Sequence, residues 1–329
     1  MTVKLVFPHW VNDQHVPTVR EFYMNLIECL SSEEVDYDIV PDYRRMSIRS
    51  PTRIEKIIPD LEIRGDYEKE ESYDHIISYH TCNPDHINVK ISYLPNYFYF
   101  DEKGYAGWSE IAESEPNYNV MNTTSVDEEF NNIKEKIVGN NISKYQQPDQ
   151  DTRIKIPTPY VFLPTQVEDD EVSKLAYVET YDLLKKCISE IPETNYHLVI
   201  KRHPRCDSDR VTELLSRAST NSQIHIVDRS IHDLIENAAA VVTVNSGVGF
   251  EALLHEKPVI NFGQTDYHWA TTTFEEQSKV SEITDVIEKF DSKDETAIRK
   301  FVVYFLENYL VNLNNEDSYI RAFDRVGII

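Results

Sequence analysis

Two short polar clusters in this 329-residue chain carry residue types that catalyse group transfer. Gln166 is followed by three consecutive acids, Glu168 to Asp170, and a second cluster reads Lys201-Arg202-His203-Pro204. A carboxylate can act as nucleophile or base, and a histidine with neighbouring cations can stabilise or protonate a leaving anion. Acids also favour the first turn of a helix, and cations can form a plain surface patch, so the structural alternatives stay open.

A third cluster, Asn245-Ser246-Gly247-Val248-Gly249, begins a predicted helix that includes Glu251. Ser246 is placed to cap this helix, and the backbone amides that follow it could bind an anion. An ordinary capped turn is the alternative. The segment lacks the GxGxxG pattern and the acidic ribose ligand of nicotinamide enzymes, which disfavours a dehydrogenase.

Glycine is scarce, with 8 in 329 residues, whereas average usage is about 7%. Two of the eight lie in an aromatic stretch that includes Gly104, Tyr105 and Trp108. Aromatic faces suit the apolar faces of sugar rings, and an aromatic minicore under a loop is the alternative. His9 and His15 follow the first apolar run, where an acceptor could also bind.

The second half of the chain alternates apolar runs with amphipathic segments. This alternation predicts a doubly wound parallel sheet, whose ligands bind outside the carboxyl ends of the strands. The three C-terminal clusters each follow an apolar run, so they are expected to converge. The predicted strands are 160–164, 197–201, 224–227, 240–244 and 258–262, with helices at 172–190, 207–218, 230–237 and 247–255.

The first half predicts a separate domain, giving a division into 1–150 and 151–329. The polar stretch 139–153, which contains Pro148, fits an interdomain linker. Two last amphipathic segments can cross back to the first domain. The first-half elements expected are strands at 3–7, 74–80 and 88–95 and helices at 17–30 and 127–138, and the last segments are 281–290 and 294–312.

Composition excludes several classes of protein. With 33 basic and 57 acidic residues the net charge is −24, which disfavours binding to nucleic acids or anionic bilayers. No apolar window is long enough to span a membrane, and the four cysteines lack ligand-like spacing. The expectation is a cytoplasmic protein with neither disulfides nor structural zinc.

The ordered motifs together resemble a known family. FLPTQVEDD, VIKRHP and TVNSGVGFEALLHEKPVINFG, with FDEKGYAGWSE upstream, are similar to the capsule polysaccharide biosynthesis family of bacterial glycosyltransferases, and most of all to its retaining β-Kdo transferases. The resemblance covers most of residues 97–267. It implies an α/β, GT-B-like fold in which two Rossmann-like domains with parallel sheets face a central cleft. The N-terminal domain would bind the acceptor and the C-terminal domain the nucleotide-sugar.

The resemblance also assigns roles to residues. Asp170 is implied as nucleophile, with Asp169 as the alternative, His203 as the group that assists the leaving phosphate, and Gln166 as the residue that orients Asp170 or the sugar. Thr165 and Gly247 depart from the family's usual residues. The implied donor-binding residues are Lys201, Arg202, Pro204, Asn245, Ser246, Gly247, Val248 and Glu251, and the acceptor-binding residues are Gly104, Tyr105, Trp108, His9 and His15.

The implied activity is metal-independent, retaining transfer of Kdo from CMP-β-Kdo to a glycan or lipid-linked acceptor of a bacterial surface polysaccharide, such as a capsule or lipopolysaccharide. No cofactor is expected, since the CMP-sugar is a substrate, and no metal site or nucleic-acid partner is expected. The alternatives are another donor, CMP-sialic acid or a UDP-sugar, and a non-catalytic nucleotide-binding assembly partner. A peripheral position at the inner face of the cytoplasmic membrane, within a membrane-bound assembly complex, is compatible with these expectations.

Overall fold

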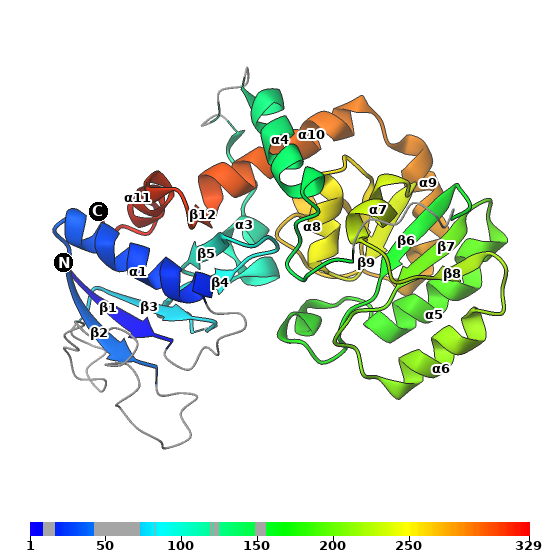
Figure 1. Cartoon of the computed structure of the whole chain (residues 1–329), viewed down its shortest axis with the longest axis horizontal. Helices are drawn as coiled ribbons and strands as arrows, with labels where there is room; N and C mark the ends of the chain where they lie inside the picture. The colour runs from blue at the N-terminus through cyan, green and yellow to red at the C-terminus, as the bar shows by residue number, and fades with distance from the viewer. Residues whose placement is uncertain (9–16, 43–72, 82, 119–120, 122–124, 149–155) are drawn as a thin grey trace. The chain divides into compact units, whose positions relative to one another are not determined.

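The computed structural model describes all residues except 9–16, 43–72, 82, 119–120, 122–124 and 149–155 (Figure 1). The chain forms two compact units, Met1–Glu110 with Phe305–Ile329, and Ile111–Tyr304. We call them unit 1 and unit 2. The end of the chain does cross back into unit 1. The first boundary lies at Glu110, well before the expected 150, because 126–148 packs within unit 2.

Unit 1 is built on a sheet with strand order β2-β1-β3-β4-β5-β12. Strands β1 to β4 pair in parallel, whereas β5 runs antiparallel to β4 and to β12. The 97–101 stretch, expected only as an aromatic cluster, is thus a buried strand. The elements are β1 (Thr2–Phe7), α1 (Pro17–Ser32), β2 (Asp36–Pro41), β3 (His75–Tyr79), β4 (Ile87–Ile91), β5 (Tyr97–Asp101), η3 (Ala106–Trp108), β12 (Val311–Asn312) and α11 (Glu316–Arg325).

Helices α1 and α11 cover one face of this sheet. Phe22 of α1 stacks on Phe98 of β5 with ring centroids 4.4 Å apart, and it also contacts Tyr319 of α11 at 5.2 Å. Alternate residues of the strands, such as Val3 and Leu5, complete this core. This shared core packs the C-terminal helix α11 against the strands at the start of the chain.

Unit 2 contains a wholly parallel sheet in the order β8-β7-β6-β9-β10-β11. This is the doubly wound order of dinucleotide-binding folds, with a switch point between β6 and β9, where the strand order reverses. The fold class expected from the sequence is confirmed. The strands are β6 (Tyr160–Pro164), β7 (His197–Lys201), β8 (Ile224–Ile226), β9 (Ala240–Thr243), β10 (Val259–Asn261) and β11 (Thr272–Thr273).

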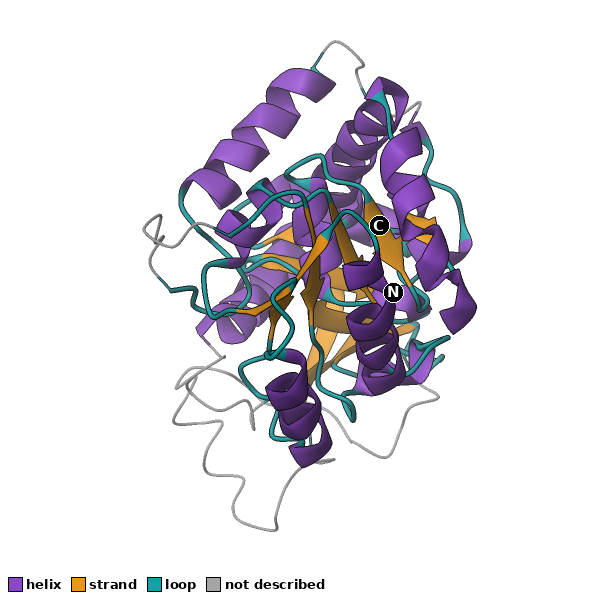
Figure 2. Ribbon diagram, turned by 90° about the vertical axis from the view of Figure 1, so that its right-hand side faces the viewer, coloured by secondary structure: helices purple, strands orange, loops and turns teal. Residues whose placement is uncertain are grey.

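Helices cover both faces of the unit 2 sheet (Figure 2). Leu183 and Cys187 of α5 lie in the core of one face, and on the other the Tyr160 hydroxyl donates to the Leu234 carbonyl of α7 at 2.7 Å. The helices are α4 (Val126–Lys134), η6 (Glu171–Leu175), α5 (Thr180–Glu190), η7 (Ile191–Glu193), α6 (Asp209–Ala218), α7 (Ile231–Glu236), α8 (Gly247–Leu253), η8 (His268–Ala270), η9 (Gln277–Glu282), α9 (Ile283–Lys289) and α10 (Ser292–Val303); α3 (Glu110–Glu113) spans the first boundary, the π-helical turn η5 (Glu135–Gly139) follows α4, and the π-helical turn η10 (Tyr304–Tyr309) spans the second boundary.

The predicted helix 172–190 is divided in two. After η6, the amides of Tyr177 and Val178 both donate to the Phe262 carbonyl at 3.0 Å, and Ala176 forms a bridge with Gly263. These bonds to the end of β10 hold the chain extended, so α5 begins only at Thr180. The break keeps the acidic cluster at the edge of the sheet. Among the described residues, no helix has both the length and the apolar composition needed to cross a bilayer.

Candidate functional site

The switch point of the unit 2 sheet is occupied by a closed amide network. Gln166, which follows β6, donates from Nε2 to Asn245 Oδ1 at 2.8 Å, and its Oε1 accepts from the Asn245 amide at 3.0 Å. The same Oε1 accepts from Thr243 Oγ1 at 3.0 Å and from the Val244 amide at 3.2 Å. Asn245 Nδ2 in turn donates to the Val172 carbonyl at 2.8 Å. Gln166 therefore fixes the ends of two strands and does not orient Asp170.

Asp170 lies at the start of η6, where its side chain accepts from the Glu171 amide at 2.8 Å. Its Oδ2 is 4.0 Å from Arg205 Nη2. The negative charge of Asp170 opposes the lowering of the His203 pKa, so these two groups interact electrostatically. Glu168 instead pairs with Arg210; burial raises the pKa of Glu168, but the hydrogen bonds from Arg210 and Ser208 and the charge of Arg210 together lower it. Asp170 is thus the acid of this cluster whose charge acts on His203 and whose carboxylate approaches Arg205.

His203 is held by two backbone contacts. Its amide donates to Thr165 Oγ1 at 2.9 Å, and its Nδ1 accepts from the Arg205 amide at 3.1 Å. Because Nδ1 is an acceptor, the neutral ring carries its proton on Nε2. Partial burial and the charge of Arg205 lower the pKa of His203, so the ring is neutral at pH 7. It can donate a hydrogen bond from Nε2 to an anion.

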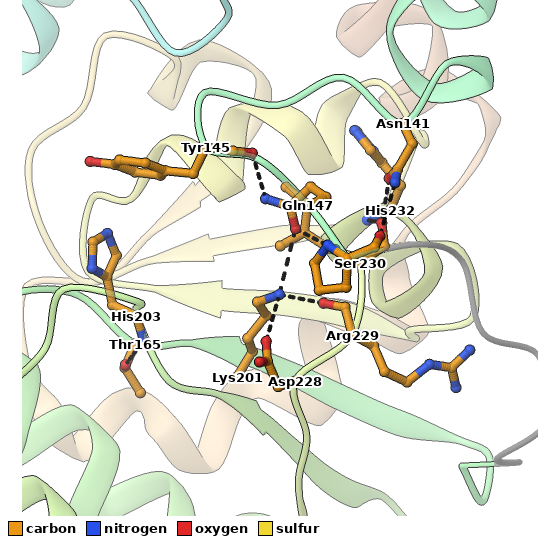
Figure 3. Close-up of polar contacts among 12 residues, drawn as sticks. Asn141, Tyr145, Gln147, Thr165, Lys201, His203, Asp228, Arg229, Ser230 and His232 are labelled. Atoms are coloured by element: carbon orange, nitrogen blue, oxygen red, sulfur yellow. Dashed lines mark hydrogen bonds and ion pairs between the residues drawn. The ribbon is translucent and has the colours of Figure 1, made fainter. Parts of the chain in front are cut away.

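Lys201 points away from His203 (Figure 3). Its Nζ donates to the Arg229 carbonyl, lies 3.3 Å from Asp228 Oδ1 and donates to Gln147 Oε1 at 3.5 Å. The side chain is only 11% exposed. Its charge is therefore committed to a loop in this structure, and its binding to the leaving phosphate stays a prediction.

The other residues of the second motif shape its loop. Arg202 Nη2 donates to the Ser208 carbonyl at 3.1 Å, which closes the turn before α6. Pro204 is exposed in that turn. The predicted cluster of three cations thus separates: only His203 and its neighbour Arg205 face Asp170.

Ser246 caps α8, as expected, and accepts from the Val248 amide at 3.2 Å. That bond occupies one of the two amides expected to bind an anion. The Tyr267 hydroxyl donates to the Ser246 carbonyl at 2.6 Å. A Cβ on Gly249 would lie 2.5 Å from this hydroxyl, so the rare glycine is explained by the close approach of Tyr267.

The 139–148 segment, predicted to be a linker, lies against the carboxyl end of the sheet. Gln147 Oε1 accepts from the Ile231 amide at 3.1 Å as well as from Lys201. Figure 3 shows Tyr145 directed toward His203, and their rings meet edge to face at 5.4 Å. Two further anchors are Ser230 Oγ to Asn141 Oδ1 at 2.5 Å and His232 Nε2 to the Ile142 carbonyl at 2.8 Å.

This segment brings further polar groups to the site. The Arg205 guanidinium lies 5.4 Å from the centre of the Tyr145 ring. Ser143 hydrogen-bonds to the carboxyl of Glu251, which is 3% exposed. Burial raises the pKa of Glu251 to about 8, although the bond from Ser143 and the charge of Lys144 oppose the shift. Glu251 therefore lies under the segment as a largely protonated group at pH 7.

The acceptor candidates lie in unit 1, around a loop organised by Asp101. Its Oδ1 accepts from the Gly104 amide at 2.9 Å and its Oδ2 from the Glu110 amide at 3.0 Å. A Cβ on Gly104 would lie 2.8 Å from Trp108 Cβ, so the loop requires glycine there. Tyr105 is 4% exposed and packs on Trp108 at 5.5 Å, which supports a minicore role for Tyr105. Trp108 is the half-buried member of the pair.

The structure thus unites Asp170 and His203 and adds three residues that the sequence analysis missed. Arg205 directly follows the recognised motif, and that adjacency could have identified it. Lys144 and Tyr145 carry no such signal, because they lie in a polar stretch without periodicity. His9 and His15 lie outside the described residues. Within the described ranges, no group of three or more His, Cys, Asp or Glu side chains could hold a metal ion.

Comparison with known proteins identifies the family of this chain. The family model described as capsule polysaccharide biosynthesis protein matches residues 103–297. Protein FixF of Sinorhizobium fredii is 32% identical over 124 residues, which are 36% of this chain and 29% of FixF. The chain thus spans under a third of the length of that relative.

Solved structures address the fold. The Thermosulfurimonas dismutans KpsC structure titled beta Kdo 2,4 transferase aligns with a TM-score of 0.53 at 15% identity, covering 92% of this chain and 90% of that one. The KpsC structure titled beta Kdo 2,7 transferase gives 0.48 at 15% identity, covering 99% of both chains. At 15% identity, the similarity to the 2,4 transferase structure shows only that the fold is shared. The family model, in contrast, matches more than half of the sequence. The chain belongs to the capsule polysaccharide biosynthesis protein family.

Proposed function

We propose that this chain is a retaining glycosyltransferase that moves Kdo from CMP-β-Kdo to a glycan or lipid-linked acceptor of a bacterial surface polysaccharide. The observation that carries the proposal is the pairing of Asp170 with His203 and Arg205 beside the switch point of the unit 2 sheet. Ligands of doubly wound sheets bind at such points. Family membership and the fold shared with a β-Kdo transferase support the proposed donor class.

Asp170 is the proposed nucleophile. In the first step its carboxylate forms a bond to the anomeric carbon of Kdo while the bond from that carbon to the CMP phosphate breaks. In the second step an acceptor hydroxyl attacks the same carbon, loses its proton and releases Asp170. Two displacements retain the anomeric configuration. Asp170 is suited to this role because its side chain is exposed and faces His203.

His203 assists the departure of CMP in this proposal. The neutral ring has its proton on Nε2, since Nδ1 accepts from the Arg205 amide. A hydrogen bond from Nε2 would stabilise the negative charge that develops on the phosphate oxygen. Arg205 positions the ring through its amide and adds positive charge near Asp170.

The nucleotide is proposed to lie over the start of α8. Ser246 and the amide of Gly247 would contact the phosphate, while the Val248 amide is already bonded to Ser246. Glu251 is proposed to hydrogen-bond a ribose hydroxyl, and its Oε1 has no hydrogen-bond partner among the described residues. Asn245 serves this subsite by holding the turn in place.

The acceptor is proposed to bind at the Gly104–Trp108 loop of unit 1. Trp108 offers a partly exposed ring, whereas Tyr105 supports it from below. Trp108→Ala should raise the acceptor KM or abolish transfer while CMP binding survives. A Trp108→Ala variant that unfolds would instead assign the residue to the minicore.

Incubation with CMP-Kdo generated in situ and a panel of glycan and lipid-linked acceptors tests the proposal. A product heavier by one Kdo residue, with retained configuration, is expected, and addition of EDTA should not slow its formation. Transfer from a UDP-sugar or from CMP-sialic acid instead would identify a different donor. Nucleotide binding without transfer from any donor would favour the non-catalytic assembly role.

Location is part of the same proposal. A lipid-linked acceptor would require the protein to work in the cytoplasm at the inner face of the membrane. With a net charge of −24, docking through a membrane-bound assembly complex is expected in place of direct lipid binding. Sedimentation with anionic vesicles should leave the purified protein in the supernatant. Direct binding to the vesicles would contradict this route.

A further inference from the structure

The site needs a cation for the donor's anionic groups, and the two cations expected from the sequence are committed elsewhere. Lys201 has three partners in the loop around Arg229 and Gln147. Arg202 is bonded to the Ser208 carbonyl. Neither can turn to a ligand at the carboxyl edge without giving up these contacts, so the positive charge must come from other residues.

Lys144 reaches the site from the 139–148 segment. Its neighbours in sequence both touch site residues, since Ser143 hydrogen-bonds to Glu251 and Tyr145 meets the His203 ring at 5.4 Å. Desolvation lowers the pKa of the Lys144 amine, and the negative charge of Asp170 opposes that shift. Lys144 nevertheless stays exposed, and no ion pair joins it to any residue that the structure describes.

The charge of Lys144 is not cancelled locally. Glu251, the buried carboxyl beside it, has a pKa raised to about 8 and is mostly neutral at pH 7. Asp170 is therefore the ionised carboxylate near Lys144, and Arg205 also lies 4.0 Å from it. An exposed and unpaired ammonium next to a nucleophile and a hydrogen-bonding histidine is suited to an anion that arrives between them.

We infer that Lys144 binds the phosphate of the donor nucleotide, and that the 139–148 segment is part of the nucleotide site. The contacts of Asn141, Ile142 and Gln147 with the α7 end hold the segment in place, so Lys144 is presented on a fixed backbone. This inference rests on the proposed nucleotide-sugar transfer. It assigns to Lys144 the role that the sequence alone assigns to Lys201.

Calorimetric titration of wild type and Lys144→Met with CMP and with cytidine tests the inference. CMP carries the phosphate and cytidine lacks it, so the variant should weaken CMP binding by about tenfold to a hundredfold, the range expected for a charged hydrogen bond. Cytidine binding should not change. Lys144→Arg should restore most of the CMP affinity. Lys136→Met, at an exposed lysine of η5 just before this segment, is the matched control and should leave both affinities unchanged.

The possible results separate the inference from the proposed function. Equal weakening of CMP and cytidine, or no weakening of either, would overturn the role of Lys144 while the nucleotide site stands. If wild type binds UDP and not CMP, the proposed donor is wrong, and the inference survives only if Lys144→Met weakens UDP more than uridine. If wild type binds none of these nucleotides, the proposed function and the inference both fail.

Discussion

Gln166 and Asn245 bond to each other twice, once through the side chains at 2.8 Å and once from the Asn245 backbone amide to Gln166 Oε1 at 3.0 Å. Gln166 also accepts from the Val244 amide. Gln166→Ala would leave these buried amides unsatisfied, at about 1–3 kcal/mol for each group. We expect the free energy of unfolding to fall by roughly 2–4 kcal/mol in denaturant titrations.

The control for this variant is Gln277→Ala, which removes an exposed bond to the Asp182 carbonyl. Surface substitutions of that kind change stability by about 0.5 kcal/mol or less. If Gln166→Ala keeps full stability but loses transfer, Gln166 acts on the substrate and the network is not its main role.

Asp170→Asn should keep its fold and its CMP affinity but lose transfer. A neutral amide cannot attack the anomeric carbon, so the covalent Kdo adduct, measured as the mass of the intact protein with donor and no acceptor, should disappear. Asp169→Asn is the matched control and should cost only a helix-dipole effect of about 0.3–1 kcal/mol. If transfer is lost in Asp169→Asn and kept in Asp170→Asn, the nucleophile is Asp169.

His203→Ala and Lys201→Met should separate catalysis from stability. Loss of the His203 hydrogen bond to the leaving phosphate should lower kcat by about 10²–10³ with little change in Tm. Lys201→Met should lower the free energy of unfolding by about 1–3 kcal/mol, because it removes the Lys201 donor from the Arg229 carbonyl and one of the two donors to Gln147 Oε1. A stable Lys201→Met that has lost activity would return Lys201 to the phosphate site.

Glu251 should make stability fall as pH rises from about 4.5 to about 8. Its pKa is raised from 4.5 to about 8 in the folded state, so between these values the folded state holds a proton that the unfolded chain has released. Stability therefore falls as pH rises through this window, by at most about 1.4 kcal/mol per pH unit. Glu251→Gln, neutral and of equal size, should flatten the curve from pH 5 to pH 8 by about that slope. Unchanged curves would contradict the burial of the carboxyl.

The buried pair His232 and His255 should act on the acid side. His232 Nε2 donates to the Ile142 carbonyl, so its Nδ1 accepts from His255 Nε2 at 3.0 Å. Burial lowers both pKa values, that of His255 from 6.5 to about 3. Below pH 6.5 the unfolded chain takes up protons that the folded state refuses, so stability falls as pH drops toward 3.

Urea titrations at successive pH values measure this loss. His255→Gln should show a weaker dependence than wild type between pH 6.5 and pH 4. A His255→Gln variant whose stability depends on pH in the same way as that of wild type would rule out a neutral, buried His255.

The fold class could be predicted from the sequence because buried parallel strands require continuous apolar runs. Runs such as 160–164 and 197–201 coincide with β6 and β7, and the polar residues after them had to lie at the carboxyl edge. The strand at 36–41 was not predicted, because DYDIVP alternates acids with apolar residues at the edge of a sheet. Pairing with β1, a tertiary contact, makes it a strand.

The direction of each side chain at that edge was decided only by tertiary structure. Lys201 and His203 are two positions apart in the sequence. The Lys201 amine nevertheless donates to the Arg229 carbonyl, whereas the His203 residue is held by hydrogen bonds with Thr165 and Arg205. The 139–148 segment has the composition of a linker, and its place over the sheet depends on bonds to residues about 90 positions later, such as His232. Local sequence specifies strands through burial and periodicity, whereas these polar contacts form only between distant segments that the fold has already brought together.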